Sequence, residues 1–151
     1  MFKAIRIQVL LVSLGLLLAM SVTAGGCNTV SGGDTNTTTT TSQVYDVTVQ
    51  KAYDLVQENE GNTDFVVLDV RTPDEYAEGY IEGAINIDYY ADDFENSLDK
   101  LDKDKTYLVY CRSGRRSAEA RDVMTELGFQ NIYNMTGGFQ DWQSEDYPIV
   151  H

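Results

Sequence analysis

The stretch Thr106–Ala120, "TYLVYCRSGRRSAEA", joins an apolar run to a helix-like segment through a short polar loop. "TYLVY" has the continuous apolar character of a parallel strand that is buried on both faces. "SAEARDVMTELG", from Ser117 to Gly128, has the composition of a helix that ends at a glycine. The stretch therefore predicts a strand, a loop that opens with Cys111 at the carboxyl end of that strand, and a helix.

The same alternation of strands and helices continues on both sides of this stretch. Apolar runs predict strands at 44–47, 65–70, 83–87, 106–110 and 131–135, and amphipathic or capped segments predict helices at 49–59, from Thr72, at 91–101, 117–128 and 137–143. Strands that alternate with helices favour an α/β domain with a mainly parallel sheet. In such sheets ligands bind beyond the carboxyl ends of the strands, which is where Cys111 lies.

The start of the second helix has a complete set of signals. Thr72 can cap the helix, Pro73 suits its first position, and Glu75 can close a capping box with Thr72. The helix is therefore expected to begin directly after Thr72.

The charge of the chain limits its partners. At 151 residues it has room for one ordinary domain, and its formal net charge is −13. A nucleic acid is therefore not an expected partner, because the phosphate backbone needs a basic surface, and anionic membrane surfaces are disfavoured for the same reason. The acidic balance is of the kind that serves solubility. Against it, the three arginines of the loop need a local explanation.

The chain has two cysteines, Cys27 and Cys111, and one histidine, His151. A zinc site needs three or four clustered Cys or His ligands, so we expect no metal. A disulfide between the two cysteines would tie a flexible segment to a loop, and the N-terminal sequence offers another use for Cys27.

The first 26 residues have the order of a secretory signal. Two cations, Lys3 and Arg6, precede an uncharged stretch from Ile7 to Cys27, which ends in small residues at 24–26. The small residues before Cys27 resemble the lipobox of prokaryotic lipoproteins, with Ala24 where a large aliphatic residue is usual. The resemblance implies cleavage before Cys27 and a diacylglycerol on its thiol.

An uncleaved membrane anchor is the alternative, because the uncharged stretch approaches the length of a bilayer span. Either arrangement sends the rest of the chain outward, since Lys3 and Arg6 stay inside. We therefore expect a protein exported to the periplasm or cell surface and held by an N-terminal lipid. Residues 27–43, which are rich in Thr, Ser, Gly and Asn, are expected to form a flexible tether to a domain at 44–150.

The loop after Tyr110 has the residues of a nucleophilic anion site. A thiol attacks as its thiolate, which nearby cations and the start of a helix both stabilise. Gly114 allows a backbone conformation that a cradle of N–H groups requires, and the arginines can bind an anion through several donors. A buried, inert cysteine with solvated arginines nearby is the simpler alternative.

Three segments resemble, in order, the signatures of the rhodanese family: "VVLDVRTPDEYAEGYIEGAINI", "YLVYCRSGRRSAEA" and "NMTGGFQDWQSEDYPI". The resemblance covers almost all of 44–150 and implies a three-layer fold, a five-stranded, mostly parallel sheet with helices on both faces. It also implies a sulfurtransferase that needs no cofactor. Its cysteine takes a sulfane sulfur from a small anion such as thiosulfate or polysulfide, as a persulfide, and passes it to a thiol or to cyanide.

Carried over by position, the resemblance makes Cys111 the nucleophile. The substrate-binding loop would consist of Arg112, Ser113, Gly114, Arg115 and Arg116. Asp69 and Arg71 would form an ion pair that supports the loop, and Gly137, Gly138 and Trp142 would form a closing turn and its packing. The family commonly has His where this chain has Tyr80, a position we interpret as packing.

The sequence leaves two further functions open. One is a persulfide carrier that a partner enzyme loads and that turns over little alone. The other is a phosphatase or arsenate reductase, because related folds use a cysteine loop for oxyanions. The relatives with phosphatase activity have a loop one residue longer, and the six residues from Cys111 to Arg116 match the sulfur-transferring length.

Overall fold

The computed structural model describes residues 42–151. In this part of the chain the sheet has five strands in the order β1-β5-β4-β2-β3, and every pairing in it is parallel. The strands are β1 (Gln43–Val47), β2 (Phe65–Asp69), β3 (Ile85–Asn86), β4 (Thr106–Tyr110) and β5 (Asn131–Met135). Cys111 directly follows β4, the central strand, so the loop that it opens leaves the middle of the sheet.

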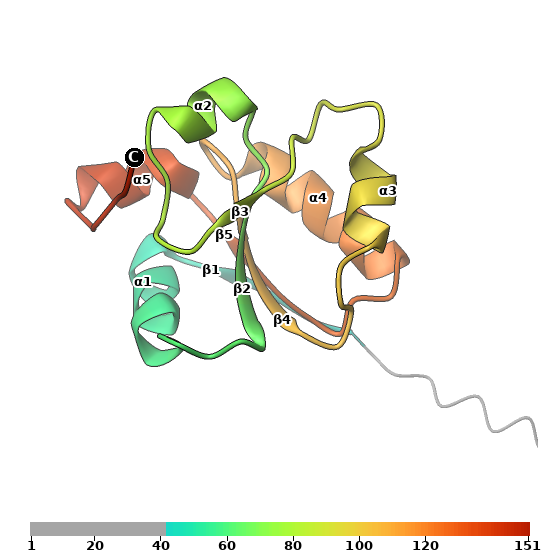
Figure 1. The fold of residues 1–151 in the computed structure, drawn as a ribbon. Coiled ribbons are helices and arrows are strands. Elements are labelled where there is room, and N and C mark those ends of the chain that lie inside the picture. The colour runs from blue at the N-terminus through green and yellow to red at the C-terminus, as the bar shows by residue number, and fades with distance from the viewer. Residues whose placement is uncertain (1–41) are drawn as a thin grey trace, which may run out of the picture. The chain divides into compact units, whose positions relative to one another are not determined.

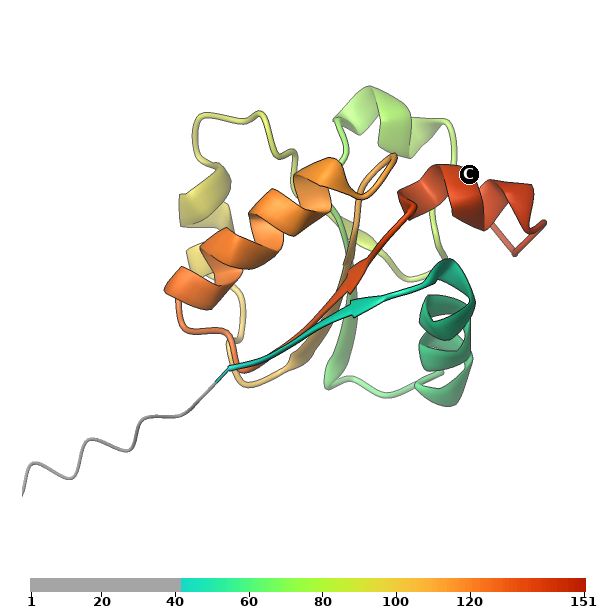
Figure 2. The same ribbon diagram turned by 180° about the vertical axis from the view of Figure 1, so that it is seen from behind.

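Helices cover both faces of this sheet (Figures 1 and 2). They are α1 (Val49–Glu58), α2 (Pro73–Ala77), α3 (Phe94–Asp99), α4 (Arg115–Glu126) and α5 (Gly138–Ser144). Helices α3 and α4 lie on one face, and α1 and α5 lie on the other. The expected α/β fold with helices on both faces is confirmed, and the sheet is wholly rather than mostly parallel.

The side chains of β4 explain why its sequence is apolar throughout. Tyr107 and Val109 pack into the core beneath α3 and α4, whereas Leu108 and Tyr110 pack into the core beneath α1 and α5. Successive side chains of a strand point to opposite faces, so a central strand between two helix layers needs an apolar residue at every position. The alternation extends to Cys111, whose side chain packs into the core beneath α3 and α4.

The expected start of α2 is confirmed in detail. The Thr72 hydroxyl accepts a hydrogen bond from the Glu75 N–H at 3.3 Å, and the Glu75 carboxylate accepts one from the Thr72 N–H at 3.1 Å. The two halves of a capping box satisfy backbone donors that the first turn of a helix leaves unpaired.

The expected start of α4 is wrong by two residues. The helix begins at Arg115 rather than Ser117, because Gly114 takes a left-handed conformation (φ 90°) at the cap position. As a result Arg115 and Arg116 belong to the first turn of α4, and the helix geometry sets the directions of their side chains. Only Arg112 and Ser113 remain between Cys111 and the capping glycine.

Two other elements are shorter than expected. Strand β3 contains Ile85–Asn86 instead of 83–87, since it lies at the edge of the sheet and pairs with β2 alone. Helix α3 covers Phe94–Asp99 instead of 91–101, and its cap residue Asp93 makes no side-chain capping bond. Strand β1 begins at Gln43, one residue inside the segment assigned to the tether.

The predicted signal, the lipidation at Cys27 and nearly all of the tether lie outside the described residues. Within 42–151, no helix combines the length and the apolar character that a membrane crossing requires.

Candidate active site

Cys111 lies almost completely buried at the carboxyl end of β4, with 1% of its surface exposed. Its Sγ accepts a hydrogen bond from the Gly114 N–H at 3.2 Å, so the chain turns back on the sulfur within three residues. The Ser117 hydroxyl donates to the Gly114 carbonyl at 3.1 Å and fixes this turn against the first turn of α4. The sulfur therefore sits near the positive end of the helix macrodipole, where negative charge is stabilised.

The turn at Gly137–Gly138 holds the other side of the loop. The N–H of Phe139 donates to the Cys111 carbonyl at 2.8 Å, and that of Gln140 donates to the Arg112 carbonyl at 3.0 Å. Gly138 has φ 65°, and a Cβ there would lie 2.6 Å from the Cys111 carbonyl oxygen. Only glycine allows so close an approach, so α5 and the cysteine loop are connected backbone to backbone.

The three arginines of the loop have different surroundings. Arg116 is buried and makes a two-fold ion pair with Glu75, at 2.7 and 2.8 Å. Arg115 is exposed, pairs with Glu119 at 3.2 Å and donates to the Tyr90 hydroxyl at 3.4 Å.

Arg112 is the arginine that stays available for an anion. It is exposed, and within residues 42–151 its guanidinium has no ion pair or hydrogen bond. Ser113 is also exposed, and no side-chain hydrogen bond involves it in this part of the chain. Of the three loop arginines expected to bind substrate, Arg112 therefore has the freest side chain and Arg116 the most constrained one.

Glu75 is the site residue that the sequence reasoning missed. The sequence indicates only its part in a capping box, yet its carboxylate also binds Arg116 beside the cysteine loop. The hydrogen bonds from Arg116 lower the pKa of Glu75 to about 2, although burial acts in the opposite direction. A signal existed in the sequence, since a capping carboxylate keeps lone pairs for a second partner.

Asp69 and Arg71 form a buried ion pair at the end of β2, with a shortest N–O distance of 2.6 Å. Arg71 also donates to the Gly79 carbonyl at 2.7 Å, and its guanidinium lies 3.9 Å from the ring centroid of Phe139. Burial disfavours the charge of Arg71, but the hydrogen bonds to Asp69 and the attraction of its negative charge together outweigh burial and raise the pKa of Arg71. The pair thus connects β2 with α5, next to the residues that bond to the cysteine loop.

Tyr80 and Trp142 pack away from the thiol. The Tyr80 ring stacks on Tyr76 with 4.1 Å between centroids, and its backbone forms a two-way bridge with Val150. Trp142 is buried and donates to the Pro148 carbonyl at 2.9 Å. Both residues hold the C-terminal segment against the domain.

A hollow of about 370 Å³ opens beside the loop, within the usual size of small-molecule sites, roughly 300–1,000 Å³. It is lined by Arg71, Glu75, Glu78, Arg112, Phe139, Gln140 and Gln143. Within 42–151, no three His, Cys, Asp or Glu side chains gather as a metal site would require. The arrangement combines a buried sulfur that accepts a hydrogen bond from a loop amide, the start of α4 next to it, and a polar recess lined by Arg112, whose guanidinium is unpaired within the described residues.

Curated relatives of this chain carry sulfurtransferase names. It is 33% identical to "Thiosulfate sulfurtransferase GlpE" of Coxiella burnetii over 94 residues, 62% of this chain and 82% of that protein. It is 40% identical to the protein of the same name from Pseudomonas entomophila over 83 residues, 55% of this chain and 73% of that one.

A solved structure agrees with this relationship. The crystal structure of a rhodanese-related protein from Thermoplasma volcanium superposes with a TM-score of 0.59 at 34% identity, over 70% of this chain and 97% of that one. The family model described as "Rhodanese-like domain" matches residues 48–145, which include every element from α1 to α5 and the Cys111 loop between them. The chain belongs to the rhodanese-like family.

Proposed function

We propose that Cys111 takes a sulfane sulfur from thiosulfate or polysulfide and passes it to a thiol or to cyanide. The chain is an enzyme of the rhodanese sulfurtransferase type, as its family and its relatives' names support. The observation that carries the proposal is the hydrogen bond from the Gly114 N–H to the Cys111 Sγ. In this bond the Cys111 sulfur is the hydrogen-bond acceptor. It lies at the start of α4, and the next residue, Arg112, has an unpaired guanidinium within 42–151.

In the first half-reaction, the Cys111 thiolate attacks the outer sulfur of thiosulfate. A bond forms between the two sulfurs, the bond between the outer sulfur and the sulfonate sulfur breaks, and sulfite leaves with that electron pair. Arg112 binds the oxyanion before the reaction, since guanidinium groups bind such oxygens through two donors. The persulfide anion then takes the place of the thiolate in the same cradle.

In the second half-reaction, the acceptor attacks the outer sulfur of the persulfide. The bond between this sulfur and Cys111 breaks, and Cys111 leaves as a thiolate, ready for another donor. With cyanide the product is thiocyanate, and with a thiol it is a new persulfide. Neither step changes the charge of the protein overall, so the site needs only to hold one negative sulfur throughout.

A persulfide carrier is the second candidate. Cys111 is almost completely buried, and a buried loop can shield a bound persulfide from small acceptors. In this function a partner protein loads Cys111, and the loaded chain turns over little with small acceptors.

The test is to incubate the full chain with thiosulfate, measure the mass of the Cys111 peptide, and then add cyanide and measure thiocyanate. We expect an added sulfur on Cys111 and repeated turnover, and no transfer by Cys111→Ser, in which the hydroxyl is a far weaker nucleophile. A loaded Cys111 without turnover would favour the carrier. Absence of loading from both thiosulfate and polysulfide would refute sulfur transfer itself.

We further propose that the domain acts outside the cytoplasm, tethered through residues 27–43 to a lipid on Cys27. The order of cations, apolar stretch and small residues in 1–26 supports this placement. The intact mass of membrane-extracted protein tests it: we expect loss of residues 1–26 and the added mass of a lipid on Cys27. Retention of Met1 would favour an uncleaved anchor instead.

A further inference from the structure

The hollow beside the cysteine loop contains polar groups that sulfur loading does not use. Its lining comes from three places: the α2 region, the residue after Cys111, and α5. Three of the lining side chains are already engaged. Arg71 pairs with Asp69, Glu75 pairs with Arg116, and the ring of Phe139 lies against the Arg71 guanidinium.

The other four lining side chains have no such partner. Glu78, Arg112, Gln140 and Gln143 take part in no side-chain hydrogen bond or ion pair within residues 42–151. They provide one anion, one cation and two amides around one recess. A purely anionic ligand would be attracted by Arg112 and repelled by Glu78. A purely cationic ligand would be attracted by Glu78 and repelled by Arg112. A ligand that bears both charges matches the whole set.

We propose that this recess, the acceptor subsite, binds the amino-acid head group of a low-molecular-mass thiol that receives the sulfur. Arg112 binds the carboxylate of the head group, Glu78 binds its ammonium, and the amides of Gln140 and Gln143 bind the remaining donors and acceptors. This inference rests on the proposed sulfur transfer and names the class of its acceptor, a zwitterionic thiol such as cysteine.

The subsite adjoins the loop that Cys111 opens, because the next residue of this loop, Arg112, is part of its lining. The backbone N–H groups of Phe139 and Gln140 donate to the carbonyls of Cys111 and Arg112, so the recess and the loop share one rigid backbone connection. The Cys111 thiol is almost completely buried, but loading adds a sulfur about 2 Å beyond Sγ. In this proposal an acceptor held by its head group directs its thiolate at this outer atom.

The two half-reactions use Arg112 in turn. Sulfite has left before the acceptor thiol attacks, so the guanidinium that bound the oxyanion is free for a carboxylate. Glu78 attracts no group of thiosulfate, so its loss should not slow loading, whereas it should slow transfer to acceptors that carry an ammonium group. It is therefore the residue that separates this proposal from sulfur loading.

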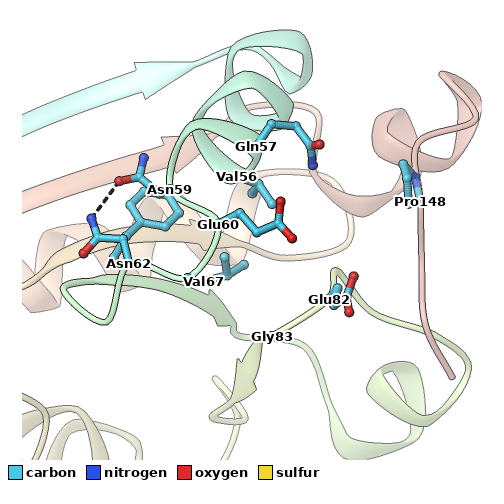
Figure 3. A pocket seen from close by; sticks show the side chains of 11 residues that line it. Val56, Gln57, Asn59, Glu60, Asn62, Val67, Glu82, Gly83 and Pro148 are labelled. Atoms are coloured by element: carbon cyan, nitrogen blue, oxygen red, sulfur yellow. Dashed lines mark hydrogen bonds between the residues drawn. The ribbon is translucent and has the colours of Figure 1, made fainter.

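A second hollow, of about 470 Å³, supplies the matched control. It lies between the end of α1, the turn before β2 and the segment before β3, and its lining includes no residue from 111 to 116 (Figure 3). Glu82 lines this hollow and, like Glu78, is exposed and unpaired within the described residues. Glu82→Gln thus removes one carboxylate charge from the same chain, away from the acceptor subsite.

The experiment uses the full chain loaded with thiosulfate and four acceptors: cysteine, cysteine ethyl ester, N-acetylcysteine and 2-mercaptoethanol. They carry both charged groups, the ammonium alone, the carboxylate alone and neither. Because their thiols differ in acidity, each acceptor is compared with itself across the wild type, Glu78→Gln and Glu82→Gln. Sulfite release in a single turnover measures loading separately.

We expect Glu78→Gln to lower kcat/KM about fivefold for cysteine and its ester, the size of effect that one solvent-exposed ion pair can give. 2-Mercaptoethanol should react as with the wild type, N-acetylcysteine should react at least as fast, and Glu82→Gln should change none of the four. Equal losses for all acceptors, or no loss for any, would overturn the subsite while sulfite release left the loading step standing.

Binding can also be followed without sulfur transfer. S-methylcysteine keeps the head group and cannot accept sulfur, so its addition should shift the NMR signals of the Gln140 and Gln143 side-chain amides. Glu78→Gln should weaken this effect. Unshifted amides at saturating S-methylcysteine would overturn the proposal even if the enzyme proved inactive with thiosulfate.

Discussion

Glu75 and Arg116 lie 41 residues apart in the sequence and form a two-fold ion pair in the fold, at 2.7 and 2.8 Å. Each belongs to the first turn of a helix, α2 or α4, and these helices follow β2 and β4, which are neighbours in the sheet. The same Glu75 carboxylate also caps α2 through Thr72. One side chain therefore fixes both helix starts and the position of the arginine next to the cysteine loop.

Glu75→Gln should separate these two roles. Gln also serves at this position of a capping box, so the variant keeps the bond to Thr72 and loses the charge pair. We expect a loss of about 1 kcal/mol in the free energy of unfolding, because the pair is partly exposed. Sulfite release from thiosulfate should also slow. Thermal unfolding and single-turnover loading measure the two effects, and unchanged loading would mean that Arg116 serves the fold alone.

The pH dependence of this stability follows from the lowered pKa of Glu75. The folded value of about 2 lies below the ordinary 4.5, so the stabilisation is complete above about pH 4.5 and is lost as pH falls toward 2. The difference in unfolding free energy between the wild type and Glu75→Gln should therefore be constant near neutral pH and shrink below about pH 4.5. Denaturant titrations across this range measure it; a constant difference down to the lowest pH would contradict the assignment.

Gly138→Ala should displace the cysteine loop. The alanine would have to adopt a left-handed backbone conformation (φ 65°), and its Cβ would lie 2.6 Å from the Cys111 carbonyl oxygen. Gly83→Ala is the matched control, since Gly83 has φ 75° and nothing within 4 Å of the added atom. We expect a loss of about 1–2 kcal/mol for the control from backbone strain alone, and a larger loss together with slower loading for Gly138→Ala. Equal losses and equal activities would show that the contact with Cys111 relaxes freely.

Arg112→Gln should weaken the attraction of anions to Cys111 more than Arg115→Gln does. Arg112 has no ionic partner within 42–151, whereas Arg115 already pairs with Glu119. The ratio of alkylation rates of Cys111 by iodoacetate, an anion, and iodoacetamide, which is neutral, measures this effect by peptide mass analysis. We expect the ratio to fall several-fold for Arg112→Gln, and less for Arg115→Gln, with both effects reduced by salt. The opposite ranking would place the anion beside Arg115.

Deletion of residues 1–42 should leave the domain as stable as in the full chain. The deletion keeps β1, which pairs with β5 along its whole length from Gln43 to Val47. Deletion of residues 1–47 is the contrast, because it removes this strand and exposes the edge of β5. Thermal unfolding should show an unchanged midpoint for the first and a clear fall for the second. A large fall for the first would mean that the leading segment packs on the domain.

The order of the elements and the position of Cys111 could both be predicted from the sequence. Uninterrupted apolar residues at 107–110 indicate a strand buried on both faces, and the loop after it then opens at the carboxyl edge of the sheet. The capping box at Thr72 and Glu75 was equally readable, because its partners are three residues apart and the bonds are local.

The contacts of the loop arginines, in contrast, depend on how the domain folds. Arg115 pairs with Glu119 four residues along the same helix, but Arg116 pairs with Glu75 of α2, and Arg112 lines the hollow beside α5. The last two contacts join segments that are distant in the sequence. The two-residue shift in the start of α4 came from the left-handed conformation of Gly114, which composition permits but does not demand. Local hydrogen bonds and apolar periodicity involve residues that are close in the sequence and can be predicted from it, whereas ion pairs between helix starts depend on which strands become neighbours in the sheet.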